Sequence, residues 1–134
     1  MRQLLQNDGL GKLIVRLSVG ILILFHGINK VTHPGSFDGL GQMLEGIGLP
    51  AFLAYGVLLG EVVGPLMAIV GWQARIGGLL MAGNMTVAVL LVHLPQLGSL
   101  NEQGGWALEL QGMYFFAALA VVFLGSGRTA LKPD

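Results

Sequence analysis

Glu61 is a carboxylate in the middle of an apolar stretch, residues 55–67. A charge is energetically costly there, so an ionisable residue in such a stretch is a candidate for a functional role. Glycines at positions 56, 60 and 64 lie four residues apart, so they line one side of a helix and let a second helix approach closely. Pro65 has no N–H to donate to the carbonyl of Glu61, four residues before it. The stretch therefore combines a buried charge with an unpaired backbone acceptor, and we interpret Glu61 as a candidate functional residue.

Other polar side chains also lie within apolar segments. With a rise of ~1.5 Å per residue and a hydrocarbon core of ~30 Å, Glu61 and Asn84 are predicted to lie near the midplane of a bilayer. The same estimate places five groups nearer one boundary: His26, Lys30, His93, Glu109 and Gln111. We predict that these five form a polar vestibule that binds a small molecule or a quinone head group. The structural alternative for Lys30 and His93 is that they only reach toward the membrane surface.

The charges inside the apolar segments balance, which predicts how they pair. Arg16 and Lys30 stand against Glu61 and Glu109. Because an unpaired charge in hydrocarbon is costly, we expect Arg16 to pair with Glu61, in a network that includes Asn84. Glu109 is then expected to pair with Lys30 or with a protonated histidine. A purely structural role for these ion pairs stays open.

His26 and His93 allow two further interpretations. Two histidines on different helices at a similar depth are an arrangement that ligates haem, and with Glu109 they would make three ligands for a divalent metal. The sequence has no dense ligand spacing such as H-E-x-x-H. We therefore expect no intrinsic cofactor, and we keep haem and metal as alternatives to quinone.

Composition assigns the chain to the integral membrane proteins. It has 134 residues, of which 54% are hydrophobic and only 10% are charged. The net charge is zero, which gives no basic field for nucleic acid. The absence of cysteine excludes a thiolate nucleophile, a cysteine-bound iron–sulfur cluster and thiol redox chemistry carried by this chain. If the protein takes part in redox chemistry, another component must carry the electrons.

Four apolar segments are each about as long as the ~20 residues that cross a bilayer. They are residues 13–31, 51–71, 76–94 and 105–124. We expect the first to be retained and not cleaved as a signal peptide, because it contains His26 and Lys30 and no A-x-A-like site follows. The sequence thus predicts an all-α fold, a four-helix transmembrane bundle that forms a single membrane domain over residues 1–134.

The longest connection, residues 32–50, carries apolar side chains at helical spacing. Phe37, Leu40, Leu44 and Ile47 recur at intervals of three and four residues. This predicts a short amphipathic helix on the outer membrane interface between spans one and two. A glycine-rich loop is the alternative, because four glycines interrupt the pattern.

Basic residues orient the predicted spans. Those flanking one side are Arg2, Lys12, Arg16, Arg75, Arg128 and Lys132, and Lys30 is the basic residue near the other side. By the positive-inside rule, both termini are expected to be cytoplasmic.

Taken together, these residues resemble a known family. The pattern comprises Arg16, His26-Gly27 and Lys30 in the first span, Glu61 and Gly64 in the second, the turn to Arg75, His93, Glu109, and the closing Gly125-Ser-Gly-Arg128. It is similar to the DoxX family over essentially the whole chain, with serine at position 126 where the family motif has proline. The resemblance implies a bacterial four-helix inner-membrane protein. It also implies an association with thiosulfate:quinone oxidoreduction, with membrane oxidoreductase complexes in oxidative-stress defence, or with responses to quinone stress.

The leading hypothesis is a small membrane subunit that offers a quinone site between its helices. Lys30 or His26 would donate a hydrogen bond to a quinone carbonyl, and Glu109 or Glu61 would accept or relay the proton. The expected partners are the lipid bilayer and an oxidoreductase protein that brings the electrons. A homo-oligomer and an enzymatic activity of the chain itself stay open. Two other functions are a non-catalytic scaffold that recruits an oxidoreductase, and a transporter of a small solute or of protons.

Overall fold

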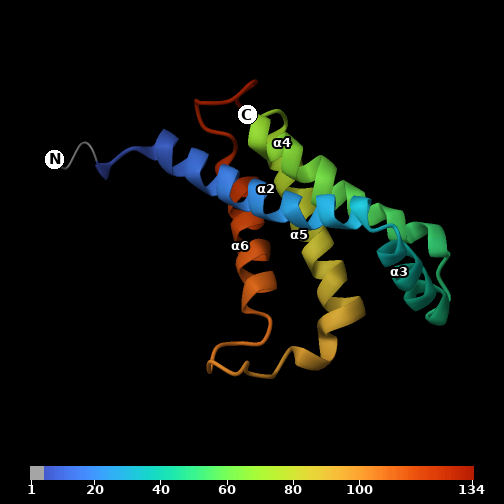
Figure 1. The fold of residues 1–134 in the computed structure, drawn as a ribbon. Coiled ribbons are helices and arrows are strands. Elements are labelled where there is room, and N and C mark those ends of the chain that lie inside the picture. Colours follow the sequence, from blue (N-terminus) through green and yellow to red (C-terminus); the bar gives the residue numbers. More distant parts are fainter. Residues whose placement is uncertain (1–4) are drawn as a thin grey trace.

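The computed structural model describes residues 5–134, and for residues 92–94 it describes the backbone without the side chains. The regular elements of this part of the chain are helices, accompanied by two isolated bridges, between Trp72 and Lys132 and between Leu100 and Trp106 (Figure 1). The prediction of an all-α fold is confirmed.

The first helix, α2 (Asp8–Thr32), begins before the predicted segment, at residue 8 instead of 13. Its start is fixed by Asn7, whose side-chain oxygen accepts a hydrogen bond from the backbone N–H of Leu10 at 3.0 Å. This cap satisfies one of the free N–H groups of the first turn. The extra turns carry Lys12 at helical spacing from Asp8, and the two side chains form an ion pair at 2.8 Å.

The second apolar segment is helical over Ala51–Val70 but is not a uniform α-helix. It starts as a 3₁₀ helix, η1 (Ala51–Gly56), passes through a π-helical turn, η2 (Leu59–Val63), and ends as α4 (Gly64–Val70). In the π turn the N–H of Gly64 bonds to the carbonyl of Leu59, five residues back. The π turn ends at Val63, two residues before Pro65, which cannot donate a backbone hydrogen bond, so the irregularity lies next to the proline.

The third and fourth segments form a hairpin. Helix α5 (Ala74–Ala88) continues into a π turn, η3 (Val89–His93), and a 3₁₀ turn, η4 (Leu94–Gln96), and α6 (Glu109–Leu124) returns. The predicted start of the fourth segment, residue 105, is four residues too early. A loop holds the chain there, because the indole Nε1 of Trp106 donates to the carbonyl of Leu97 at 2.7 Å and Gly104 has a positive φ of 85°.

Among residues 5–134, three helices are long and apolar enough to cross a membrane: Asp8–Thr32, Ala51–Val70 and Ala74–Leu91. Helix α6 is apolar but has 16 residues, which corresponds to about 24 Å. The structure therefore gives three candidate spans and a shorter fourth apolar helix.

The amphipathic helix predicted between spans one and two is present as α3 (Gly35–Gly46). Of the apolar side chains in the predicted pattern, Phe37 and Leu44 are buried, whereas Ile47 follows the last residue of the helix and is 60% exposed. The ring of Phe37 stacks on Tyr55 of η1, with centroids 4.8 Å apart. The glycine-rich loop alternative is wrong, because burial of this one apolar face compensates for the low helix propensity of the glycines.

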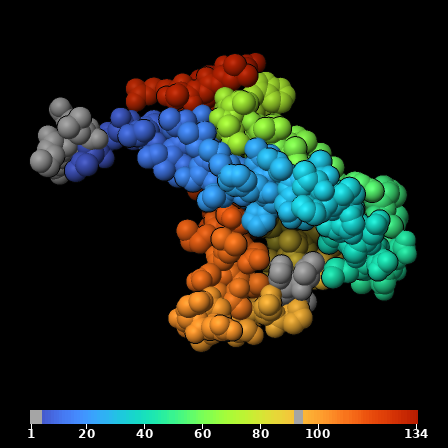
Figure 2. Space-filling view, viewed as in Figure 1, coloured from blue at the N-terminus to red at the C-terminus, as the bar shows by residue number. Residues whose placement is uncertain are grey.

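The helices pack as two pairs that diverge from one end of the molecule. Helix α2 runs with the Ala51–Val70 segment and α5 runs with α6. The pairs contact each other where α4 and η2 meet α5 and where α2 meets α6 (Figures 1 and 2). The core where they meet includes Val19, Ile23, Ala68, Met81, Ala118 and Val121. Large apolar side chains such as Phe25, Phe116 and Phe123 are exposed, which suits a surface that faces lipid.

Candidate functional site

Glu61 lies in the π turn η2 and is bound by side chains from two other helices. Its Oε1 accepts from the ammonium of Lys30 in α2 at 2.6 Å, and its Oε2 accepts from the amide of Asn84 in α5 at 3.0 Å. The residue is only 3% exposed, whereas a quarter of the Lys30 side chain is accessible. Both oxygens of the buried Glu61 carboxylate thus accept hydrogen bonds, and the Lys30 side chain is the accessible part of the cluster.

Two glycines bring the three helices close enough for this cluster. A Cβ added at Gly27 of α2 would lie 2.7 Å from the backbone carbonyl carbon of Glu61 and 2.8 Å from Val62. A Cβ added at Gly60 would lie 2.6 Å from the side-chain carbonyl carbon of Asn84. Since real Cβ atoms essentially never come within 3.0 Å of other heavy atoms, only glycine fits at either position.

The predicted glycine stripe is therefore partly used for close approach. Gly60 and Gly64 both face α5, where a Cβ at Gly64 would lie 2.9 Å from the carbonyl oxygen of Gly77. Gly56 has open space around it. The approach of α2 to Glu61 depends instead on Gly27, which lies outside the stripe and on the opposite helix.

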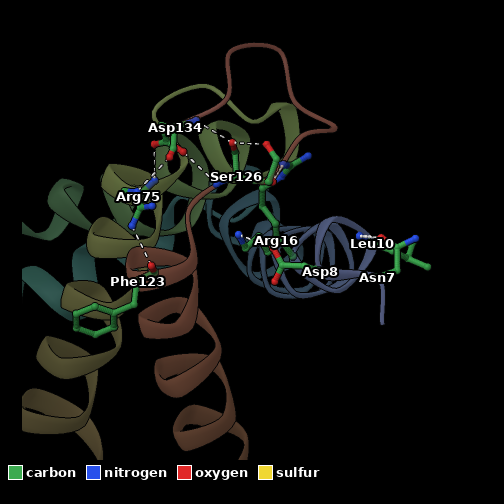
Figure 3. Close-up of polar contacts among 10 residues, drawn as sticks. Asn7, Asp8, Leu10, Arg16, Arg75, Phe123, Ser126 and Asp134 are labelled. Atoms are coloured by element: carbon green, nitrogen blue, oxygen red, sulfur yellow. Dashed lines mark hydrogen bonds and ion pairs between the residues drawn. The ribbon is translucent and has the colours of Figure 1, made fainter. Parts of the chain in front are cut away.

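The expected pairing of Arg16 with Glu61 is wrong. Arg16 is 2% exposed, and its guanidinium donates to two backbone carbonyls of the C-terminal segment, those of Ser126 and, at 2.7 Å, Thr129 (Figure 3). The long side chain extends toward the segment after α6, which crosses α2 and offers carbonyl acceptors. Of the predicted network, Glu61 and Asn84 are in contact and Arg16 is not.

The expected pairing of Glu109 with Lys30 is also wrong. Glu109 is exposed, and its Oε1 accepts from the side-chain amide of Asn101 at 3.0 Å, in the loop that precedes α6. Lys30 is bound to Glu61 instead. The depth estimate used backbone positions alone, and the four-carbon stem of a lysine carries its ammonium several ångströms from its Cα.

His26 lies one turn before Lys30 on α2 and contacts Tyr114 of α6. The two rings meet edge to face with centroids 5.6 Å apart, and the Tyr114 hydroxyl lies 3.5 Å from Nε2, at the limit of hydrogen bonding. Gln111 is half-buried in the first turn of α6. The side chain of His93 lies outside the described part of the structure, so its place in a vestibule, a haem site or a metal site stays a prediction.

Within residues 5–134 the described contacts thus divide the predicted vestibule. Lys30 belongs with Glu61 and Asn84, His26 with Tyr114, and Glu109 with the loop before α6. The sequence analysis did not select Tyr114, and a tyrosine in an apolar helix gives no signal that separates it from ordinary packing.

The chain matches the family model of DoxX over residues 11–94. It belongs to the DoxX family. The matched region contains all three members of the Glu61 cluster, and the DoxX resemblance noted in the sequence is confirmed.

Three relatives extend the comparison of this DoxX protein. The chain is 29% identical to "Putative oxidoreductase CatD" of Bacillus subtilis, an alignment that covers 92% of this chain and 86% of the relative. It is 32% identical to "Uncharacterized membrane protein Rv3486" of Mycobacterium tuberculosis, over 96% of this chain and 84% of the relative. It is 30% identical to "Inner membrane protein YqjF" of Escherichia coli, over 64% of each. No solved structure matches the chain.

The Glu61 cluster of this DoxX protein has the parts that proton-coupled binding requires. Lys30 supplies a charged donor that is accessible, Glu61 supplies a carboxylate shielded from solvent, and Asn84 holds the second carboxylate oxygen in place. An acceptor group placed beside Lys30 would share its ammonium protons with Glu61. The arrangement can therefore bind a polar acceptor and exchange a proton with it.

Proposed function

We propose that this DoxX protein is an integral membrane subunit of a quinone-linked oxidoreductase system, and that the quinone head group binds beside Lys30. The observation that supports this most directly is the contrast within the cluster, with Glu61 buried and the Lys30 side chain a quarter exposed. A quinone is a lipid-soluble molecule with carbonyl acceptors, so it can reach a site between membrane helices from the bilayer. The name of the Bacillus subtilis relative, which describes an oxidoreductase, agrees with this proposal.

In the proposed reaction each component has one role. Lys30 donates a hydrogen bond to one quinone carbonyl, and Glu61 relays protons to the reduced head group. Reduction to the quinol consumes two electrons and two protons. The electrons come from a partner oxidoreductase, because the sequence has neither a cysteine nor a convincing cofactor motif. The protons enter from the aqueous side near Lys30.

Binding of a quinone analogue tests the proposal. Purified protein titrated with a short-chain ubiquinone or menaquinone should show saturable binding, which Lys30→Gln weakens about tenfold, the equivalent of one charged hydrogen bond. Lys12→Gln is the matched control, since it removes the same charge from the same helix far from Glu61. Lack of saturation in the unmodified protein, or an equal loss in both variants, would refute a site at Lys30.

We further propose that all four apolar helices cross the inner membrane as one domain, with both termini in the cytoplasm. The start of α2, the turn between α4 and α5, and the segment after α6 all meet at one end of the molecule, as an even number of crossings requires (Figure 1). This end carries Lys12, Arg75, Arg128 and Lys132, as the positive-inside rule expects of the cytoplasmic side. The name of the Escherichia coli relative agrees with an inner-membrane location.

Single cysteines test this topology cleanly, because the chain has none of its own. A membrane-impermeant maleimide added to spheroplasts should label Glu45→Cys on α3 and Glu102→Cys in the loop before α6. It should label Lys132→Cys only after the membrane is permeabilised. Labelling of Lys132→Cys on intact spheroplasts would overturn the orientation, and labelling of only one of the two loop cysteines would overturn the count of four spans.

A further inference from the structure

A recess of about 610 Å³ lies at the end of the molecule where α2 begins and α6 ends. Basic residues from three parts of the chain line it: Lys12 from α2, Arg75 from the start of α5, and Arg128 from the C-terminal segment. The carboxylates of Asp8 and Asp134 also line it. What this recess can bind therefore depends on which of these charges are already neutralised.

Four of the five charges have partners within the protein. Lys12 pairs with Asp8 at 2.8 Å. The carboxylate of Asp134 accepts from the backbone N–H groups of Ser126 at 3.0 Å and Arg75 at 3.1 Å (Figure 3). The guanidinium of Arg75 bonds through Nη1 to two carbonyls at the end of α6, and through Nε to the backbone carbonyl of residue 134.

Arg128 has no such partner. Its side chain is exposed, and within residues 5–134 no hydrogen bond or ion pair of its guanidinium is found. The guanidinium lies against Gly9 in the first turn of α2, where an added Cβ would be 3.2 Å from both Nε and Nη2. Arg128 also borders a second recess of about 240 Å³, which shares Gly9 with the first. One positive charge without a partner among the described residues thus lines both recesses.

The walls of these recesses are partly apolar and exposed. Leu124, at the end of α6, lines the first, and Leu10 and Leu13 of α2 line the second. Leu10 is 51% exposed and Leu124 is 39% exposed. In a membrane-spanning protein the ends of the helices lie at the depth of the lipid head groups. A free cation beside exposed apolar side chains at this depth matches an anionic phospholipid.

We propose that Arg128 forms a binding site for the phosphate of an anionic phospholipid in the recess that Lys12 and Arg75 also line, with the acyl chains along the exposed leucines. The planar guanidinium of Arg128 donates two parallel hydrogen bonds to phosphate oxygens. A zwitterionic lipid also has a phosphate, but its head group carries a positive charge that Arg128 repels, so the anionic lipid is preferred. This site is at the opposite end of α2 from Lys30 and is independent of the proposed quinone chemistry.

Native mass spectrometry of the full chain in detergent tests the site, with phosphatidylglycerol and phosphatidylcholine as competing probes. We expect phosphatidylglycerol to bind preferentially and Arg128→Gln to weaken its binding about tenfold, whereas Lys132→Gln weakens it less than about twofold. Both variants remove one positive charge from the same segment, and Lys132 does not line the first recess. Arg128→Lys should fall between, since it keeps the charge and loses the paired geometry.

Three outcomes would overturn the proposal. Equal binding of the two lipids would show that the site does not distinguish an anionic head group from a zwitterionic one. Equal losses in Arg128→Gln and Lys132→Gln would show diffuse surface attraction instead of a site. Displacement of phosphatidylglycerol by inorganic phosphate at an equal concentration would show that the recess binds free phosphate and gains nothing from the lipid. Because Arg128 is exposed and makes no bond within the described chain, its replacement should leave the thermal melting temperature unchanged, which excludes misfolding as the cause of a loss.

Discussion

Replacing Gly27 by alanine is expected to destabilise the protein by about 3 kcal/mol, although it adds a single methyl group. The new Cβ would lie 2.7 Å from the carbonyl carbon of Glu61 and 2.8 Å from a methyl group of Val62. The Glu61 contact is with backbone, which cannot rotate away as a side chain can. Helix α2 must therefore move away from η2, which also separates Lys30 from Glu61. The measurement is a thermal melt in detergent, combined with size-exclusion chromatography.

Gly11→Ala is the matched control for this prediction. It lies in the same helix, and a Cβ added there meets no atom within 4 Å. We expect this variant to be unchanged or stabilised by up to about 1 kcal/mol, because alanine has the higher helix propensity. If Gly27→Ala melts at the same temperature as Gly11→Ala, then α2 does not pack against η2 as the structure shows.

The difference between these two glycines shows why the sequence predicts the helices better than their contacts. Apolar length is a local property, so the segments around residues 13–31, 51–71 and 76–94 could be located to within a few residues at most ends. The sequence places Gly27 inside the first predicted span and Gly11 just before it, but it does not show that η2 lies against Gly27 while Gly11 has open space. The glycines of the 56–60–64 stripe were predicted to face a neighbouring helix, and Gly56 does not.

The ion pairs were predicted incorrectly for a related reason. Charge balance correctly indicates that Glu61 needs a cation, but Arg16 and Lys30 lie on the same helix and both are long enough to reach inward. Which one does so depends on the segment after α6, where Gly125 and Gly127, both with φ of 76°, turn the chain back over α2. The carbonyls that bind Arg16 are 110 and 113 residues away in the sequence. No spacing rule connects positions so distant.

The predicted vestibule stays a prediction, since the side chain of His93 lies outside the described residues, but the contact of Glu109 shows that similar depth does not by itself imply proximity. His26 and Glu109 were predicted to lie at similar depths. Helix α6, however, begins only at Glu109, and the Glu109 side chain contacts the loop that precedes α6. Residues on one helix turn, by contrast, are reliable neighbours, and His26 and Lys30 do lie one turn apart on α2.

Lys30→Met is expected to destabilise the protein by about 3 kcal/mol, because it leaves the carboxylate of Glu61 buried with Asn84 as its remaining polar partner. Glu61→Gln should cost less. A glutamine can still accept from Asn84, and the released ammonium of Lys30, whose side chain is already a quarter exposed, can turn toward water. Thermal melts of the two single variants under identical detergent conditions test whether Lys30 and Glu61 interact. They also test whether loss of Lys30 costs more stability than loss of the Glu61 charge.

The double variant Lys30→Met with Glu61→Leu separates a structural pair from a functional one. Because apolar residues of similar size often replace a buried ion pair at no cost, it should recover most of the stability that Lys30→Met loses. If it melts near the unmodified protein but no longer binds a quinone analogue, the charges serve the ligand, as proposed. If it folds and binds the analogue unchanged, Lys30 and Glu61 have only a structural role, and the quinone site must lie elsewhere. Destabilisation equal to the sum of the single effects would show instead that Lys30 and Glu61 do not interact, contrary to the 2.6 Å contact.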